Sequence, residues 1–126
     1  MEFKPGFRLS TIDTLVIFTS LITACYVHSH SHLMTWVIFF VVAHFFLFCN
    51  IMRMSRVPEL VWASIFIVFS SLSIQQNFPW LITFSLSFII SFILIFLETK
   101  KASYHGVFWK QLNPNLPEWF NNKRNS

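Results

Sequence analysis

His44 is the position in this chain whose residue type and placement carry the most chemical information. It lies near the middle of a long apolar stretch. An ionisable side chain at that depth in a membrane is costly, so it should face protein or water rather than lipid. We expect a neutral imidazole that is hydrogen-bonded to a hydroxyl of a neighbouring helix and fixes helix packing. Counting depth along antiparallel helices places three hydroxyl side chains near its level: Thr19, Ser64 and Ser91.

A proton relay, or a ligand to haem or metal, is the alternative interpretation of His44. A haem held by two histidines needs a second histidine at the same depth. The nearest, His28, lies about 15 Å away along the membrane normal if both helices are regular. The sequence therefore predicts no haem held within this chain alone.

Three further histidines alternate with serines at His28, His30 and His32. In an extended turn their imidazoles could converge on copper, zinc or nickel. In a continuing helix only His28 and His32 would share a face. No carboxylate or cysteine stands nearby to orient or complete a site, so we expect a polar turn with weak metal affinity. The chain thus predicts no bound cofactor, with copper, zinc and haem as alternatives.

The elements that position these residues are apolar helices. Hydrophobic residues make up 55% of the 126 residues and charged residues only 11%, whereas a water-soluble domain carries about a quarter charged residues. Four apolar blocks without lysine or arginine are each long enough to cross a bilayer as a helix, and they cover residues 11–27, 33–52, 58–74 and 79–97. No glycine interrupts them, so we expect straight spans. We predict an all-α integral membrane fold of two antiparallel hairpins, with a bundle over residues 1–98.

The basic residues predict the orientation of the spans. All nine lie before the first block, between the second and third, or after the fourth, while the other two connections have none. By the positive-inside rule both termini should be cytoplasmic. The net charge of +4 then indicates orientation and contact with the lipid bilayer, not a nucleic-acid surface.

Helix ends and packing faces can also be predicted. Ser10 and Asp13 form a capping box before the first span, and Trp62 should lie in the aromatic belt at the cytoplasmic interface. Hydroxyl residues should mediate helix contacts, on the fourth span at Thr83, Ser87 and Ser91 and on the third at Ser64 and Ser71. A second stripe on the fourth span offers a surface to a partner's helices: Phe84, Phe88, Phe92 and Phe96.

The tail, residues 99–126, is too rich in large apolar groups to remain solvated. Asn115, Pro117 and Glu118 predict a short terminal helix. The aromatic side chains either lie in the lipid interface or dock on another subunit; they are Tyr104, Phe108, Trp109, Trp119 and Phe120.

These residues favour a non-catalytic accessory or assembly subunit of a larger complex in a bacterial cytoplasmic membrane. Straight spans, short outer loops and an aromatic tail agree with that interpretation. One alternative is a homo-oligomeric channel or carrier with His44 in its path. The other is a metal-associated or haem-associated redox protein that uses His44 or the three outer histidines.

Overall fold

The computed structural model describes residues 3–126, and it is all-α within that range. The helices are α1 (Thr11–His28), α2 (His32–Phe46), the π-helical turn η1 (Leu47–Ile51), α3 (Arg56–Gln75), α4 (Trp80–Thr99), α5 (Trp109–Leu112) and α6 (Leu116–Asn125). Four segments are long and apolar enough to cross a membrane: α1, α2 continued by η1, α3 and α4. Their ends fall within two residues of the predicted spans. The chain is therefore a multi-pass membrane protein by length and hydropathy.

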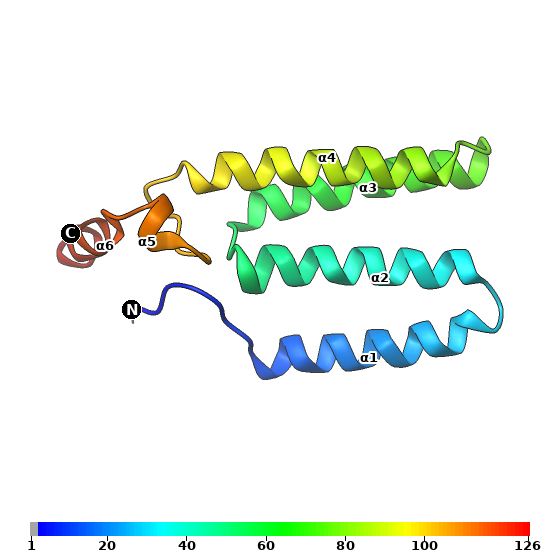
Figure 1. Ribbon diagram of the computed structural model, residues 1–126, viewed down its shortest axis with the longest axis horizontal. Coiled ribbons are helices and arrows are strands. Elements are labelled where there is room, and N and C mark those ends of the chain that lie inside the picture. Colours follow the sequence, from blue (N-terminus) through cyan, green and yellow to red (C-terminus); the bar gives the residue numbers. More distant parts are fainter. Residues whose placement is uncertain (1–2) are drawn as a thin grey trace.

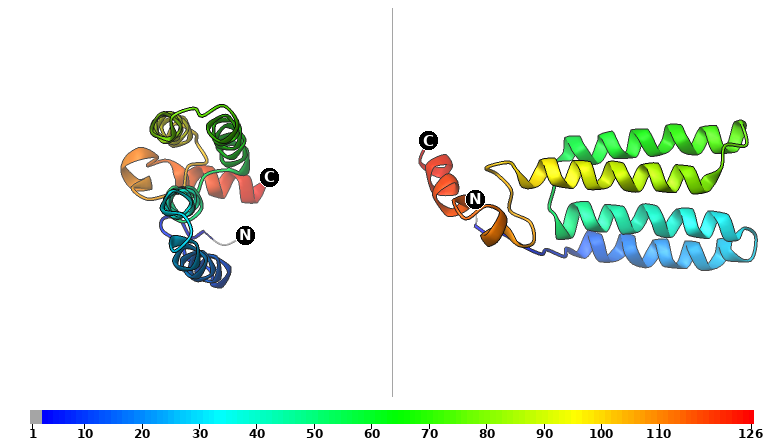
Figure 2. Two further views of the ribbon diagram at one scale, coloured as in Figure 1. Left: turned by 90° about the vertical axis from the view of Figure 1, so that its right-hand side faces the viewer. Right: turned by 45° about the horizontal axis from the view of Figure 1, so that its top comes forward.

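The four long helices pack as two antiparallel pairs, α1 with α2 and α3 with α4. Both chain ends lie at the same end of the helices (Figure 1), which we name the terminal end; the opposite end, with the two tight turns, is the hairpin end. Seen along the helices, α2 lies between α1 and the α3–α4 pair (Figure 2). The bundle is therefore not closed, because α1 packs beside α2 at the periphery and buries only Ala24.

The start of α1 follows the local sequence chemistry. The Asp13 amide donates to Ser10 Oγ at 3.1 Å, and the Ser10 amide donates to Asp13 Oδ2 at 2.8 Å. The predicted capping box is confirmed. It satisfies two amides that the first helical turn would otherwise leave without partners.

The second span is not a regular α-helix throughout, contrary to the expected straight spans. Its last turn, η1, is π-helical and contains the buried side chain of Asn50. The Asn50 amide group donates to Arg8 O at 2.6 Å and to Asp13 Oδ2 at 2.9 Å. A π-helical turn carries one extra residue per turn and so redirects the side chains that follow it. Here it joins the N-terminal segment to the end of the second span.

The core lies between α2, α3 and α4 and is centred on Phe48, Trp62 and Phe66. The Trp62 side chain is 1% exposed, and its indole N–H donates to Ser87 O at 3.0 Å. The placement of Trp62 in an interfacial belt was therefore wrong. The indole combines a large apolar ring with one donor, and α4 supplies a close backbone acceptor because Ser87 is small.

Hydroxyl side chains line the α4 side of this contact. Thr83, Ser87 and Ser91 are each at most 2% exposed, and the hydroxyls of Ser73 and Thr83 lie 2.7 Å apart across the α3–α4 interface. On α3 the buried positions are Trp62, Phe66 and Ser73. The expected contact positions Ser64 and Ser71 instead lie outside it, with their hydroxyls bonded to carbonyls of their own helix.

The tail folds back onto the terminal end of the same chain. The Val107 amide donates to Ile51 O at 2.9 Å, and the Gly6 amide donates to His105 O at 2.7 Å. Gly106 lies so close to the Met52 carbonyl that a Cβ there would be 2.3 Å from its oxygen. The predicted terminal helix is α6, preceded by Asn115. The tail thus caps the helices at their terminal end.

Candidate functional site

The His44 side chain is buried among aromatic rings in the core. Its ring stacks on Trp62 with centroids 4.6 Å apart and planes 12° from parallel. Rings of Phe40, Phe48 and Phe88 lie at centroid distances between 4.3 and 6.2 Å. Nδ1 lies 2.7 Å from Phe40 O, so Nδ1–H donates and Nε2 carries the lone pair. Nε2 is buried and has no hydrogen-bond partner among the described residues.

The structure brings none of the three expected hydroxyl groups to His44. Each bonds instead to the carbonyl four residues earlier on its own helix, at 2.7 Å for Thr19 and 2.8 Å for Ser64 and Ser91. Ser91 is buried on α4, whereas Thr19 and Ser64 are exposed, and Thr19 lines a groove between α1 and α2. Counting residues along the spans predicted that these hydroxyls lie at the same depth as His44. It could not predict the direction in which each side chain points from its helix axis.

The outer histidines divide into a pair and a single residue. His28 and His32 meet edge to face with centroids 4.4 Å apart. The ring of His30 is directed instead to its own turn, with Nδ1 3.0 Å from Ser29 Oγ and 3.3 Å from Tyr26 O. Among the described residues, no cluster of three histidine, cysteine or acidic side chains has the spacing of a metal site. Of the three imidazoles at this turn, the structure therefore brings only those of His28 and His32 together.

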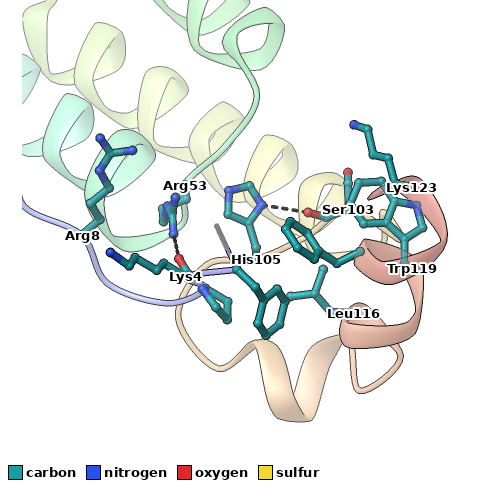
Figure 3. Close-up of a pocket in the computed structure, with 11 residues that line it drawn as sticks. Lys4, Arg8, Arg53, Ser103, His105, Leu116, Trp119 and Lys123 are labelled. Carbon is teal, nitrogen blue, oxygen red and sulfur yellow. Dashed lines mark hydrogen bonds between the residues drawn. The ribbon is translucent and has the colours of Figure 1, made fainter. Parts of the chain in front are cut away.

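A cavity of about 430 Å³ lies at the terminal end, between the N-terminal segment, the 52–55 connection and the tail. Figure 3 shows Lys4, Arg8 and Arg53 on one side of it, Trp119 and Lys123 on the other, and His105 between them. The remaining described lining residues are Phe3, Pro5, Ser103, Leu116 and Phe120. Four of these eleven side chains are lysine or arginine, and none is acidic. The cavity is therefore basic on one wall and largely aromatic on the other.

Local backbone contacts hold the basic wall. The Arg8 amide donates to Asn50 O at 3.1 Å, which fixes the N-terminal segment against η1. Arg53 adopts the left-handed backbone conformation, with φ of 47°, and its guanidinium donates to the Lys4 carbonyl. Burial, together with the nearby positive charge of Arg8, lowers the pKa of Arg53 from its ordinary value. Arg53 is thus a half-buried cation with the charge of the exposed Arg8 nearby.

The tail aromatics have different environments. Tyr104 is 1% exposed; its hydroxyl donates to Val107 O at 2.7 Å, so this side chain belongs to the chain's own core. Burial and the charge of Glu98 raise the pKa of Tyr104, which keeps the phenol neutral. Trp109 and Phe120 contact Phe3, at centroid distances of 5.8 and 5.0 Å.

The two other tail aromatics differ in exposure, because Trp119 is half-buried and Phe108 is exposed. Lys123 Nζ lies 5.0 Å from the Trp119 ring. Phe108 has a left-handed backbone and is 69% exposed. Of the tail aromatics proposed for partner docking, Phe108 is therefore the one that presents most of its side chain outward.

Sequence reasoning did not identify this cavity. A usable signal was present: the chain has two glycines, and both lie in segments that meet at the terminal end, Gly6 with a φ of 97° and Gly106 against the Met52 backbone. Glycine permits such close backbone approach. No family model matches this chain, and no curated protein or solved structure matches it either. The functional argument therefore rests on the chain's own geometry.

Proposed function

We propose that this multi-pass membrane protein is a non-catalytic accessory or assembly subunit of a larger membrane complex, with its terminal end on the cytoplasmic side. Of the four phenylalanines in the α4 stripe, Phe84 packs against the core and contacts Phe40. The observation that carries the proposal is the exposure of the other three, Phe88, Phe92 and Phe96. These side chains are 51 to 61% exposed, and the inner edge of Phe88 also contacts His44. Phe88 and Phe92 meet edge to face at 4.9 Å, which makes a continuous aromatic ridge.

The chemistry inside the spans supports a structural role. His44 donates to a backbone carbonyl and stacks on Trp62, while the serine and threonine hydroxyls bond within helices or across the α3–α4 contact. These groups rigidify the packing of three helices. A rigid helical unit with an aromatic ridge suits van der Waals association with another membrane helix, because aromatic side chains bury large areas and pair in defined geometries.

Affinity purification of the full chain in mild detergent tests this proposal. We expect one or more other membrane subunits to co-purify in a fixed ratio. The triple variant Phe88→Ala, Phe92→Ala, Phe96→Ala should lose them, because it removes the ridge. A matched control is Leu15→Ala, Phe18→Ala, Ile22→Ala on α1, which removes side chains of similar exposure, 61 to 69%; it should keep them.

Two outcomes would overturn the proposal. One is a chain that purifies only with copies of itself, which would favour the channel or carrier interpretation. The other is equal loss of the co-purifying subunits from both triple variants, which would mean that apolar exposure in general, and not the α4 ridge, retains them.

A further inference from the structure

Among the described residues that line the cavity at the terminal end, two arginines and one lysine carry positive charge without forming an ion pair. They are Arg8, Arg53 and Lys123. Two acidic side chains near this end already have partners. Asp13 accepts hydrogen bonds from Ser10 and Asn50. Glu98 accepts from the Ser55 amide at 3.1 Å and pairs with Lys101 at 2.6 Å.

The two arginines also have donors to spare. A guanidinium has five N–H donors, and that of Arg53 gives one hydrogen bond, to the Lys4 carbonyl. The Arg8 side chain makes no hydrogen bond within residues 3–126. Planar guanidinium groups match the oxygens of a phosphate in a paired geometry. An anion bound here would offset the repulsion between the two arginines.

We propose that this cavity binds the phosphate group of an anionic phospholipid, with the headgroup against Arg8 and Arg53. The position supports a lipid source, because Arg8 lies just before α1 and Arg53 just after η1, at the depth where the headgroups of one leaflet lie. The opposite wall supports it as well. Phe3 and Phe120 offer apolar surface to a glycerol and acyl chain, a feature that free phosphate would not need.

The test uses the full chain, stripped of lipid in mild detergent, and native mass spectrometry to measure ligand binding. The probes are phosphatidylglycerol, phosphatidylcholine and inorganic phosphate. We expect phosphatidylglycerol to bind at least about tenfold more tightly than phosphatidylcholine. The variant Arg8→Gln, Arg53→Gln should weaken its binding about 25-fold, from about fivefold for each basic residue near an anionic headgroup.

A matched control removes two charges at the same end but outside the cavity: Lys100→Gln, Lys110→Gln. Both side chains are exposed and lie over aromatic rings, of Phe96 and Trp109. This control should bind phosphatidylglycerol within about twofold of the wild type. If the double arginine variant does not fold, Arg8→Gln alone keeps the Arg53 hydrogen bond and should still weaken binding about fivefold.

Three results would overturn the proposal. Equal binding of the two lipids would exclude recognition of an anionic headgroup. Equal weakening by the lysine control would assign the affinity to general surface charge. Binding of inorganic phosphate as tightly as phosphatidylglycerol would assign the site to free phosphate instead of lipid.

Discussion

Trp62 is the residue on which the packing of three helices depends. It stacks on His44 and on Phe66, and its N–H reaches the backbone of α4 at Ser87. The same Ser87 carbonyl also accepts from Ser91 Oγ at 2.8 Å. Losing the indole N–H alone would therefore leave that carbonyl with a partner, so the main contribution of Trp62 is the volume and contact of its ring.

We expect Trp62→Ala to lower the free energy of unfolding by about 3–5 kcal/mol, because it empties a buried site. Trp62→Phe should cost about 1–2 kcal/mol, since most of the ring contact remains and one hydrogen bond is lost. Unfolding in mixed micelles of increasing denaturing detergent measures both values. The matched control Trp36→Ala removes a tryptophan that is 67% exposed and should be nearly neutral. An equal decrease in the free energy of unfolding for Trp62→Ala and Trp36→Ala would contradict the conclusion that helix packing depends on Trp62.

Gly106 is the residue that allows the tail to approach the 52–55 connection. A Cβ at this position would lie 2.3 Å from Met52 O and 2.7 Å from the Tyr104 hydroxyl oxygen. Both neighbours are constrained, the first by the backbone and the second by the hydrogen bond of Tyr104 to Val107 O.

Gly106→Ala should therefore loosen the tail without unfolding the spans, at a cost of about 1–3 kcal/mol for overpacking. Hydrogen exchange measures this directly, since the Val107 and Gly6 amides bond across the contact. We expect faster exchange in peptides covering residues 3–9 and 103–109. Ala102→Ser, at an exposed position of the same segment, should leave exchange unchanged. Unaltered exchange in the Gly106 variant would show that the close contact does not hold the tail.

At the scale of elements, the molecule consists of two hairpins and a cap. Each hairpin pairs its own helices, and the seam between hairpins is formed by the core around Phe48, Trp62 and Phe66. The cap is held by backbone hydrogen bonds from Val107 to Ile51 O and from Gly6 to His105 O. Glu98 joins the end of α4 to the start of α3 through the Ser55 amide. The hairpins are thus distinct units, joined by one aromatic seam, by the short 52–55 connection and by the cap.

We predict that the two hairpins assemble when they are produced as separate fragments. Residues 1–54 and 55–126, co-expressed with a tag on the first, should co-purify, because helices inserted independently associate through packing. Trp62→Ala in the second fragment should reduce the yield of the complex several-fold, while Trp36→Ala in the first should not. Recovery of the tagged fragment alone would show that the covalent connection is required.

At the scale of the whole molecule, the two ends have different chemistry. The hairpin end has tight turns, with histidines in one of them. The terminal end has the basic cavity, the cap and the exposed lysines of the tail. This asymmetry predicts how the chain inserts, because basic residues are retained on the cytoplasmic side.

Cysteine labelling of intact cells tests that orientation, in a background from which Cys25 and Cys49 have been removed. Single cysteines at Ser29 and Gln76, both exposed at the hairpin end, should react with a membrane-impermeant maleimide from outside. A cysteine at the exposed Gln111 of the tail should react only after the membrane is opened. The reverse pattern would place the terminal end outside and would remove the basis for a cytoplasmic cap.

The sequence by itself determined the elements and their ends. In lipid each backbone amide must be satisfied within its own segment, so four apolar blocks of sufficient length become four helices, and an even number returns the chain to the side where it began. The capping box at Ser10 is equally local, because both of its hydrogen bonds join residues three apart. The spans and the capping box can be predicted without knowing which helix faces pack together.

Only the tertiary structure decided which helix faces meet. Spans that are apolar on nearly every side carry no stripe that separates the core from lipid, since lipid tails are as apolar as leucine. Depth can then be counted along the sequence but direction cannot. For that reason His44 bonds to Phe40 O instead of a hydroxyl on another span, and Trp62 lies in the core instead of the interface. The cavity is likewise a tertiary product, because Arg8, Arg53 and His105 lie far apart in the chain and meet only when the tail closes on the N-terminal segment.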